Sequence, residues 1–389
     1  MIMPATINPN IAALHEDMRA WRHHLHAMPE IAFEETETAA YIAGLLQSFG
    51  IEEVHTHIAK TGVVAVIRGK QPGPWVGLRA DIDALRVTET NDLPYRSKNP
   101  GKMHACGHDG HTAMLLGAGK YLADTRDFAG TAALIFQPAE ENEGGGRVMV
   151  EEGLFTRFPI ESVYGLHNDP DLPAGNFSIK TGPIMAAYDV FTITLKGFGA
   201  HAAKPHLGRD VLVAAGQLIG ALQTIVSRSL NPMESAVVSV TQMNGGDTWN
   251  VLPQEATLRG TARTFLPSVQ DMVEQRMGEI IQGIAAMFGM QGELRYERRY
   301  PALVNDEAPT RIAVAAASAL VGEERIDLHP QSVMGSEDFA FLQKVKPGAY
   351  IRLGMGSGGV PHNPGYVFND DILPVGAAYW VEVVKNVCK

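Results

Sequence analysis

Apolar residues recur at helical spacing in the first fifty positions of the chain. They stand three or four residues apart, at Ile11, Leu14, Met18, Trp21 and Leu25. This spacing predicts one face of a helix that begins near Asn10 and stops before Pro29. A second helix is expected over residues 35–49, because Gly50 is the residue type that most often follows a last helical turn.

Short apolar runs come next, with a helical pattern between two of them. The runs cover residues 63–67, 75–78, 132–136 and 163–166, and the helical pattern covers residues 112–123. Strands that alternate with helices are typical of an α/β sheet. We therefore expect an α/β fold in which a mixed sheet carries helices on both faces.

The pattern changes after residue 187. Phe191, Ile193 and Leu195 alternate with polar residues, which predicts a half-exposed strand. A helix over 209–226, strands at 236–242 and 255–264, a helix over 268–288 that Ser268 caps, and a strand at 293–298 follow. The order βαββαβ is that of a ferredoxin-like module. From residue 301 the first pattern resumes, up to an amphipathic helix over 373–387, so we expect domain 188–300 to be inserted into a catalytic domain of residues 1–187 and 301–389.

Composition and charge narrow the function classes. A chain of 389 residues with 45% hydrophobic and 19% charged residues suits a globular protein of two domains. Its net charge of −11 gives no electrostatic footprint for nucleic acid. We find no apolar run long enough to span a bilayer and no secretory signal pattern, so a cytoplasmic protein with no membrane partner is expected. With only two cysteines in the chain, we expect no disulfide framework.

Polar residues gather where the expected strands end. Asp81 and Asp83 follow one strand, Glu140 and Glu141 follow another, and His167 closes a third. In open α/β sheets, ligands bind just outside the carboxyl ends of the strands. These three strand ends therefore predict one shared crevice.

The densest polar cluster is the segment MHACGHDGHT at residues 103–112. Its thiol, imidazole and carboxylate groups suit zinc or a similar divalent metal. Cys106 and His108 are two positions apart, so in an extended loop both side chains point the same way. The segment alone also fits a buried, apolar cysteine and solvated histidines. The strand-end acids and His167 favour the metal site.

Eight short motifs occur in order along nearly the whole chain. They are RADIDAL, HACGHDGH, FQPAEE, GLH, GAHAAKPH, GTARTF, MGSEDFA and PHNPGY. Together they resemble the hippurate hydrolase and indole-acetyl-amino-acid amidohydrolase branch of the co-catalytic metallopeptidases. The wider group includes aminoacylase, carboxypeptidase G and succinyl-diaminopimelate desuccinylase. The resemblance implies hydrolysis of the amide bond of N-acyl-L-amino acids, a metallopeptidase catalytic domain, and an inserted domain that forms a homodimer, with a tetramer as the alternative.

The resemblance also implies two divalent metal ions per subunit. Their ligands would be Cys106, His108, Glu141, His167 and His362. A thiolate would replace the carboxylate that bridges the metals elsewhere in the group, and a coordinated thiol is deprotonated outright. Asp81 stands where the wider group has a histidine ligand, so it is expected to hold the loop, and Asp83 to support the site. Zinc, manganese, cobalt and nickel all suit such ligands.

Glu140 is the general base that the resemblance implies. It would take a proton from the attacking water and pass it to the leaving amine. From the residues alone, the acidic run over 140–143 reads equally as a solvated loop. Adjacent side chains on an extended segment point in opposite directions, so Glu140 and Glu141 need a turn that reorients them.

Three residues of the inserted domain complete the implied site. His201 would stabilise the oxyanion in the partner subunit, and Asn250 would make a polar contact across subunits. Arg263 is expected to clamp the substrate carboxylate, with a surface salt bridge as the alternative reading. His111 and His206 are assigned structural roles.

Two departures from the motifs and three rival functions remain. Arg86 stands where the motif usually has proline and Lys204 where it usually has a neutral residue, and both bear on substrate choice. The rivals are a cysteine hydrolase with Cys106 as nucleophile, a catalytically silent metal-binding homologue, and a dipeptidase or carboxypeptidase that uses the same two-metal chemistry.

Overall fold

The computed structural model describes residues 7–141 and 143–389, which form two compact units. The larger unit takes in residues 1–182, 304–331 and 338–389, and the smaller unit takes in residues 183–303 and 332–337. Segment 332–337, which the sequence pattern predicts to be part of the catalytic domain, belongs to the smaller unit instead. Residues 183–187 and 301–303 also belong to the smaller unit.

The larger unit is built on one mixed sheet. Its strands are β1 (Glu53–Ile58), β2 (Gly62–Arg68), β3 (Gln71–Asp81), β4 (Ala129–Gln137), β5 (Ser162–Asp169), β6 (Phe177–Ser178), β15 (Ile326–Asp327) and β16 (Gly348–Gly354). They lie in the order β1-β2-β4-β3-β5-β16-β6-β15. The central strands β4, β3, β5 and β16 are parallel, and β1 and β2 pair antiparallel with their neighbours. Strand β6 pairs antiparallel with β16 and parallel with β15. The predicted mixed α/β sheet is confirmed.

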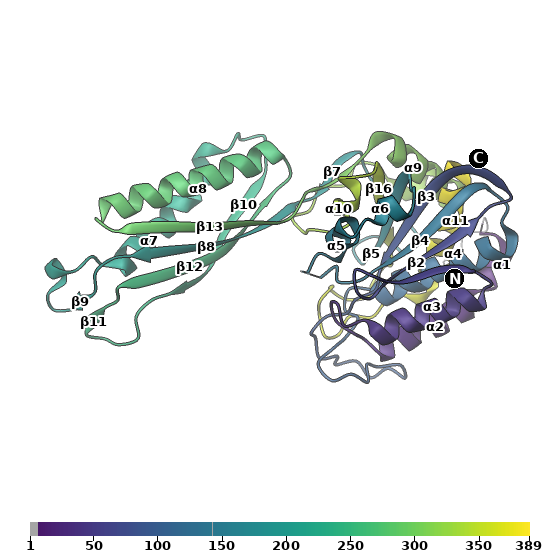
Figure 1. The fold of residues 1–389 in the computed structure, drawn as a ribbon, viewed down its shortest axis with the longest axis horizontal. Helices are drawn as coiled ribbons and strands as arrows, with labels where there is room; N and C mark the ends of the chain where they lie inside the picture. Colours follow the sequence, from purple (N-terminus) through teal and green to yellow (C-terminus); the bar gives the residue numbers. More distant parts are fainter. Residues whose placement is uncertain (1–6, 142) are drawn as a thin grey trace. The chain divides into compact units, whose positions relative to one another are not determined.

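Helices cover this sheet because its central strands are apolar on both faces. The helices are α1 (Pro9–Ala12), α2 (His15–Ala27), α3 (Thr36–Ser48), α4 (His108–Thr125), α5 (Gly145–Glu151), α6 (Leu154–Arg157), α9 (Glu307–Val321), α10 (Ala340–Gln343) and α11 (Leu373–Val387). Val63 and Ala65 join one core with residues of α2, α3, α4 and α11. The intervening Val64 and Val66 are also buried. Strand β2 is thus packed on both faces (Figure 1).

Three local features differ from the predicted elements and affect the site. The first apolar face is split between α1 and α2, with Ala13 and Leu14 at the break. Helix α4 begins at His108, earlier than predicted, after Gly107 in the left-handed region at φ 94°. A Cβ on Gly107 would lie 2.2 Å from Asn168 Oδ1, so glycine is required there. Strand β5 also continues past His167 to Asp169.

The smaller unit has the βαββαβ order expected from the sequence. Its main elements are β8 (Ala187–Lys196), α7 (Val211–Thr224), β10 (Ala236–Asn244), β12 (Glu255–Thr264), α8 (Pro267–Met287) and β13 (Gln291–Tyr300). The antiparallel sheet has the order β10-β12-β8-β13, and its core is shared with α7 and α8 (Figure 1). Helix α8 starts with Pro267 rather than with a cap from Ser268, since proline suits the first helical position.

Helix α7 continues into a π-helical turn, Ile225–Ser229. The stretch Val211–Ser229 has a mean hydropathy of 1.4, so by length and composition alone it meets the criterion for crossing a membrane. The sequence analysis found no such run. Its buried positions, which include Val211, Leu218 and Leu222, recur on one face and belong to the core of the smaller unit. Core helices meet the same criterion, so this is weak evidence for a membrane span.

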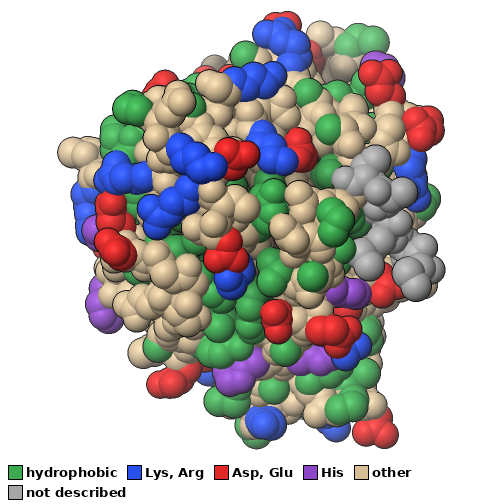
Figure 2. All heavy atoms as spheres, turned by 90° about the vertical axis from the view of Figure 1, so that its right-hand side faces the viewer, with side chains coloured by type: hydrophobic (Ala, Val, Ile, Leu, Met, Phe, Trp, Pro, Cys, Tyr) green, Lys and Arg blue, Asp and Glu red, His purple; other side chains and the backbone are tan. Residues whose placement is uncertain are grey.

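Charges of both signs share the surface. On the face that Figure 2 shows, Lys and Arg side chains lie among Asp and Glu side chains. This mixture accompanies the net charge of −11.

Candidate active site

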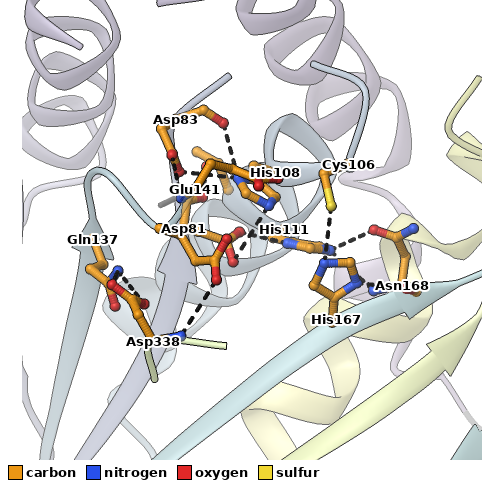
Figure 3. Close-up of polar contacts among 12 residues, drawn as sticks. Asp81, Asp83, Cys106, His108, His111, Gln137, Glu141, His167, Asn168 and Asp338 are labelled. Carbon is orange, nitrogen blue, oxygen red and sulfur yellow. Dashed lines mark hydrogen bonds and ion pairs between the residues drawn. The ribbon is translucent and has the colours of Figure 1, made fainter. Parts of the chain in front are cut away.

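The five predicted metal ligands lie together in the larger unit. The ligand atoms of Cys106, His108 and His167 all lie within 4.8 Å of one another. Those of Cys106, Glu141 and His362 form a second group that meets the same limit. Cys106 belongs to both groups, which is the arrangement expected of a thiolate shared by two metal ions. Figure 3 shows four of the five side chains facing one another.

Four separate segments supply these side chains. Cys106 and His108 come from the loop before α4 and its first residue, Glu141 from the turn after β4, and His167 from β5. The backbone N–H of His362 donates to Ala105 O at 2.7 Å, which ties the loop after β16 to the cysteine loop. His362 Nε2 lies 3.0 Å from Glu141 Oε1. Three of the segments follow or end parallel strands, as the strand-end argument required.

The orientation of His108 leaves one ring nitrogen available to a metal ion. Its Nδ1 lies 2.9 Å from Asp83 O and 3.2 Å from Asp83 Oδ1. Both partners are acceptors, so Nδ1 carries a hydrogen, and in the neutral ring that binds metals Nε2 presents its lone pair. Nε2 is buried and has no hydrogen-bond partner among the described residues. A buried nitrogen without a partner is costly unless a ligand occupies that position, so this residue fits a metal ion.

His167 is held in the same manner. Its Nδ1 donates to Asn168 O at 2.7 Å, and its Nε2 lies 3.5 Å from Cys106 Sγ. Burial lowers the pKa of His167 well below its ordinary value, which favours the neutral imidazole that binds metals.

The Cys106 thiol is poorly suited to act as a nucleophile. Burial, followed by the nearby Glu141 carboxylate, raises the pKa of Cys106 to about 12. Catalytic cysteines need the opposite shift, because the thiolate is the reactive form. A metal ion supplies what this thiol lacks, since it deprotonates a coordinated cysteine outright.

A turn between β4 and α5 reorients the two adjacent glutamates. Ala139 adopts the left-handed region at φ 55°, immediately before Glu140. The N–H of Glu141 donates to Asp83 Oδ2 at 3.0 Å, and the N–H of Asp338 donates to Glu140 Oε1 at 3.4 Å. As a result, ligand atoms of Glu140, Glu141 and His108 lie within 4.8 Å of one another. Glu140 is buried, so the alternative interpretation of this acidic run as a solvated loop is wrong for that residue.

Asp81 and His111 belong to a buried network below the ligands. Arg79 Nη1 donates to Asp81 Oδ2 at 2.7 Å. His111 Nδ1 donates to Asp81 Oδ1 at 2.6 Å (Figure 3). Asn168 N–H donates to His111 Nε2 at 3.1 Å. Both ring nitrogens of His111 are therefore engaged within the protein, which fits a structural role.

The same network extends to the proposed base, Glu140, through Asp338, a residue to which the sequence assigned no role. Arg79 Nη2 donates to Asp338 Oδ1 at 2.9 Å, and Gly146 N–H donates to Asp338 Oδ2 at 2.8 Å. The backbone N–H of Asp338 is the group that contacts Glu140. Arg79 and Asp338 lie in the motifs RADIDAL and MGSEDFA, so the sequence marked them without indicating what they do.

His201, Asn250 and Arg263 lie in the smaller unit and stay predictions. His201 is exposed on β9 (Ala200–His201), which pairs with β11 (Val251–Leu252). Ala202 N–H donates to Asn250 O at 2.9 Å, so one short ribbon brings His201 and Asn250 together. Nothing in the smaller unit tests their roles in catalysis.

Arg263 is held at half-burial on β12. Its guanidinium carbon lies 4.2 Å from the centre of the Tyr188 ring, and Nη1 donates to Ala262 O at 3.1 Å. Among the described residues no carboxylate forms an ion pair with it. The alternative reading as a surface salt bridge is therefore not supported within that part of the chain.

A cavity of about 570 Å³ opens beside Glu141. Its wall includes Ile31, Phe33, Lys60, Leu85 and Arg86. Arg86 is one of the two residues that depart from the motifs, and its place in this wall supports a part in substrate choice. Lys204, the other, lies exposed in the smaller unit.

Comparison with known proteins gives a consistent result. A model of peptidase family M20/M25/M40 matches residues 77–386. N-acetyl-L-cysteine deacetylase of Bacillus subtilis (strain 168) is 42% identical over 381 residues, which cover 97% of this chain and 90% of the relative. Hippurate hydrolase of Campylobacter jejuni is 39% identical over 381 residues and covers 98% and 99%. A crystal structure of a Bacillus subtilis protein, described as a dinuclear metal-binding peptidase of the M20 family, has a TM-score of 0.86 with 36% identity and covers 97% and 99% of the two chains.

Proposed function

The chain belongs to peptidase family M20/M25/M40, and on that premise we propose that it is a metal-dependent amidohydrolase of N-acyl-L-amino acids. The products are a carboxylic acid and a free amino acid. Two relatives are named for this class of reaction, an N-acetyl-L-cysteine deacetylase and a hippurate hydrolase. The observation that carries the proposal is the pair of ligand groups that share Cys106, with Glu140 beside them.

The donor set fits two divalent metal ions. Cys106, His108, Glu141, His167 and His362 would hold them, and Cys106 is the residue that both ligand groups share. When bound, the ions polarise the amide carbonyl and make water more acidic. Zinc, manganese, cobalt or nickel would satisfy this mixture of sulfur, nitrogen and oxygen ligands.

Glu140 is proposed as the general base. Its carboxylate takes a proton from the attacking water and then gives that proton to the leaving amine nitrogen. The contact with the backbone N–H of Asp338 fixes the carboxylate, so Glu140 is oriented before substrate arrives. Adjacent Glu141 has its backbone held by Asp83, which turns its side chain toward the metal ligands instead.

The smaller unit supplies the remaining proposed roles. We propose that His201 stabilises the oxyanion, that Asn250 contacts the partner subunit, and that Arg263 binds the substrate carboxylate. These roles need a homodimer, or a tetramer, formed through the smaller unit. A cytoplasmic location is proposed from the sequence pattern alone.

The proposal is tested by metal-loaded protein and a panel of N-acyl amino acids, with release of free amine as the readout. The panel includes N-acetyl, N-benzoyl and longer acyl groups, together with dipeptides as the rival substrate class. Turnover of N-acyl amino acids that disappears with a chelator and returns with metal supports the proposal. Turnover that withstands chelation but is lost on alkylation would instead establish the cysteine hydrolase. Dipeptides as the better substrates would establish the peptidase.

A further inference from the structure

Glu35 is a buried carboxylate that the proposed mechanism does not use. It directly precedes α3, and its side chain is 0% exposed. Among the described residues no cation forms an ion pair with it. Burial of a carboxylate without a cation is unfavourable. Glu35 therefore calls for a reason beyond packing.

Helix capping is not that reason. Glu35 occupies the N-cap position of α3, but its side chain makes no capping hydrogen bond there. Glu30 does this instead, since its carboxylate accepts the N–H groups of Thr38 at 2.8 Å and of Glu37 at 3.3 Å. The two glutamates thus have separate tasks at the start of one helix.

Glu35 reaches across to the turn that carries the proposed base. Its Oε1 accepts the N–H of Ala139 at 2.9 Å, and its Oε2 accepts the hydroxyl of Thr61 at 2.6 Å. Ala139 is the residue in the left-handed region, at φ 55°. A residue with a Cβ is disfavoured in that region and stays there only when its surroundings hold it.

The turn is held on both sides of Glu140. Before it, Ala139 N–H is bound by Glu35, and after it, Glu141 N–H is bound by Asp83 at 3.0 Å. The Glu140 side chain is itself held by the N–H of Asp338. Loss of the first contact would leave the backbone of Ala139 held only through its carbonyl, which accepts the N–H of Gly145 at 2.9 Å, while the other two contacts stay in place.

We infer that Glu35 is a positioning residue, which holds Ala139 in its left-handed conformation and thereby aims the Glu140 carboxylate. The inference rests on the proposed function of Glu140. Burial, together with nearby Asp83, raises the pKa of Glu35 to about 7. The role requires only a hydrogen-bond acceptor at Oε1, so a neutral side chain of the same shape would perform it.

The test compares Glu35→Ala, Glu35→Gln and Glu30→Ala in the metal-loaded protein. Glu35→Ala is expected to lower kcat by about 10²-fold, the effect of a small misplacement of a reacting group, with KM and metal content nearly unchanged. Glu35→Gln should restore most of kcat, because its amide oxygen accepts the Ala139 N–H and its NH₂ donates to Thr61. Glu30→Ala, the matched control, disturbs α3 without touching Ala139 and should leave kcat near wild type.

Three outcomes would overturn the inference. They are an unchanged kcat in Glu35→Ala, a loss in Glu35→Gln as deep as that in Glu35→Ala, and an equal loss in Glu30→Ala. If Glu35→Ala does not fold, the comparison of Glu35→Gln with Thr61→Val decides. Both variants retain the hydrogen bond to the Ala139 N–H and should keep most of kcat. A large loss of kcat in either variant would contradict the positioning role of Glu35.

Crystal structures separate this inference from the proposed function. In Glu35→Ala, Ala139 should leave the left-handed region and the Glu140 carboxylate should turn, and in Glu35→Gln both should stay as in wild type. A wild-type protein without amidohydrolase activity would refute the proposed function alone. An unmoved Ala139 in Glu35→Ala would refute the positioning role whatever the activity.

Discussion

The two sets of proposed site residues are held by their own units in contrasting ways. In the larger unit Cys106 and His108 are buried, Glu141 and His167 are half-buried, and His362 is exposed. Hydrogen bonds fix the rings of His108 and His167 and the backbone of Glu141. In the smaller unit His201 and Asn250 are exposed, and their contacts lie within one short ribbon. The proposed site residues of the larger unit are thus oriented before substrate binds. Those of the smaller unit are exposed, and we expect them to act only in contact with substrate or with another subunit.

The largest expected loss of activity tests the oriented residues of the larger unit. Glu140→Ala should retain its metal and lose about 10²- to 10⁴-fold in kcat, the usual contribution of a general base. The measurement is turnover of an N-acyl amino acid together with elemental analysis. Glu151→Gln is the control, because Glu151 is an exposed acid on α5 that pairs with Arg147. Near-normal turnover in Glu140→Ala would remove this residue from the mechanism.

The next largest loss of activity concerns the exposed residues of the smaller unit. His201→Ala should lower kcat by about 10²- to 10³-fold if His201 stabilises the oxyanion, and His206→Ala, an exposed neighbour, should not. Mixed subunits sharpen the comparison. If His201 serves the site of its partner, mixing His201→Ala with Glu140→Ala protein should recover some turnover, because one hybrid site is intact. No recovery after verified subunit exchange would contradict the shared site.

A smaller loss is expected at Arg263. Removal of a charge-assisted hydrogen bond to the substrate carboxylate costs about 1.5–3 kcal/mol, or roughly 10- to 100-fold in kcat/KM. Arg263→Ala should show this loss with substrates that carry a free carboxylate and much less with their amides. Arg259→Ala, an exposed arginine on the same strand, is the control. Equal losses on both substrates would exclude the clamp.

The smallest effect is on stability and concerns the packing around α4. Burial alone would lower the pKa of His26, but hydrogen bonds to Asp109 at 2.8 Å and Glu89 at 3.3 Å raise it to about 9. A raised histidine pKa contributes stability fully below the unfolded pKa of about 6.5, and this is lost as pH rises through 9. The free energy of unfolding should fall over that window by roughly 3 kcal/mol or less.

Denaturant titrations at fixed metal loading measure this pH dependence. In His26→Gln the decline between pH 6.5 and 9 should become shallower, whereas in His329→Gln, at an exposed histidine, it should match wild type. Parallel curves for His26→Gln and wild type would show that His26 does not carry the charge assigned to it.

The features that could be predicted from the sequence are those set by local periodicity or carried by short motifs. The βαββαβ order and the mixed sheet follow from local periodicity. The five proposed metal ligands came from the family resemblance, and the structure brings their ligand atoms together. Glu35 could not be found in this way. Its partner Ala139 is 104 residues distant, and an acid at the start of a helix reads as a cap.

Ala139 shows a second limit. Left-handed turns are usually marked by glycine or asparagine, and an alanine gives no such signal. The conformation of the Glu140 turn is instead imposed by tertiary contacts from Glu35, Asp83 and Asp338. Asp83 and Asp338 stand within motifs, whereas Glu35 lies outside all of them, so the sequence gives no sign of its role.

The most direct test of the account is the metal content of the protein with and without Cys106. Elemental analysis of wild type, saturated with one divalent metal and freed of excess, should give two ions per subunit, as the two ligand groups require. Cys106→Ala should bind fewer, because it removes a ligand from both groups at once, and its amide hydrolysis should fall with its metal content. An unchanged stoichiometry of two in Cys106→Ala would contradict the shared thiolate on which the site is built.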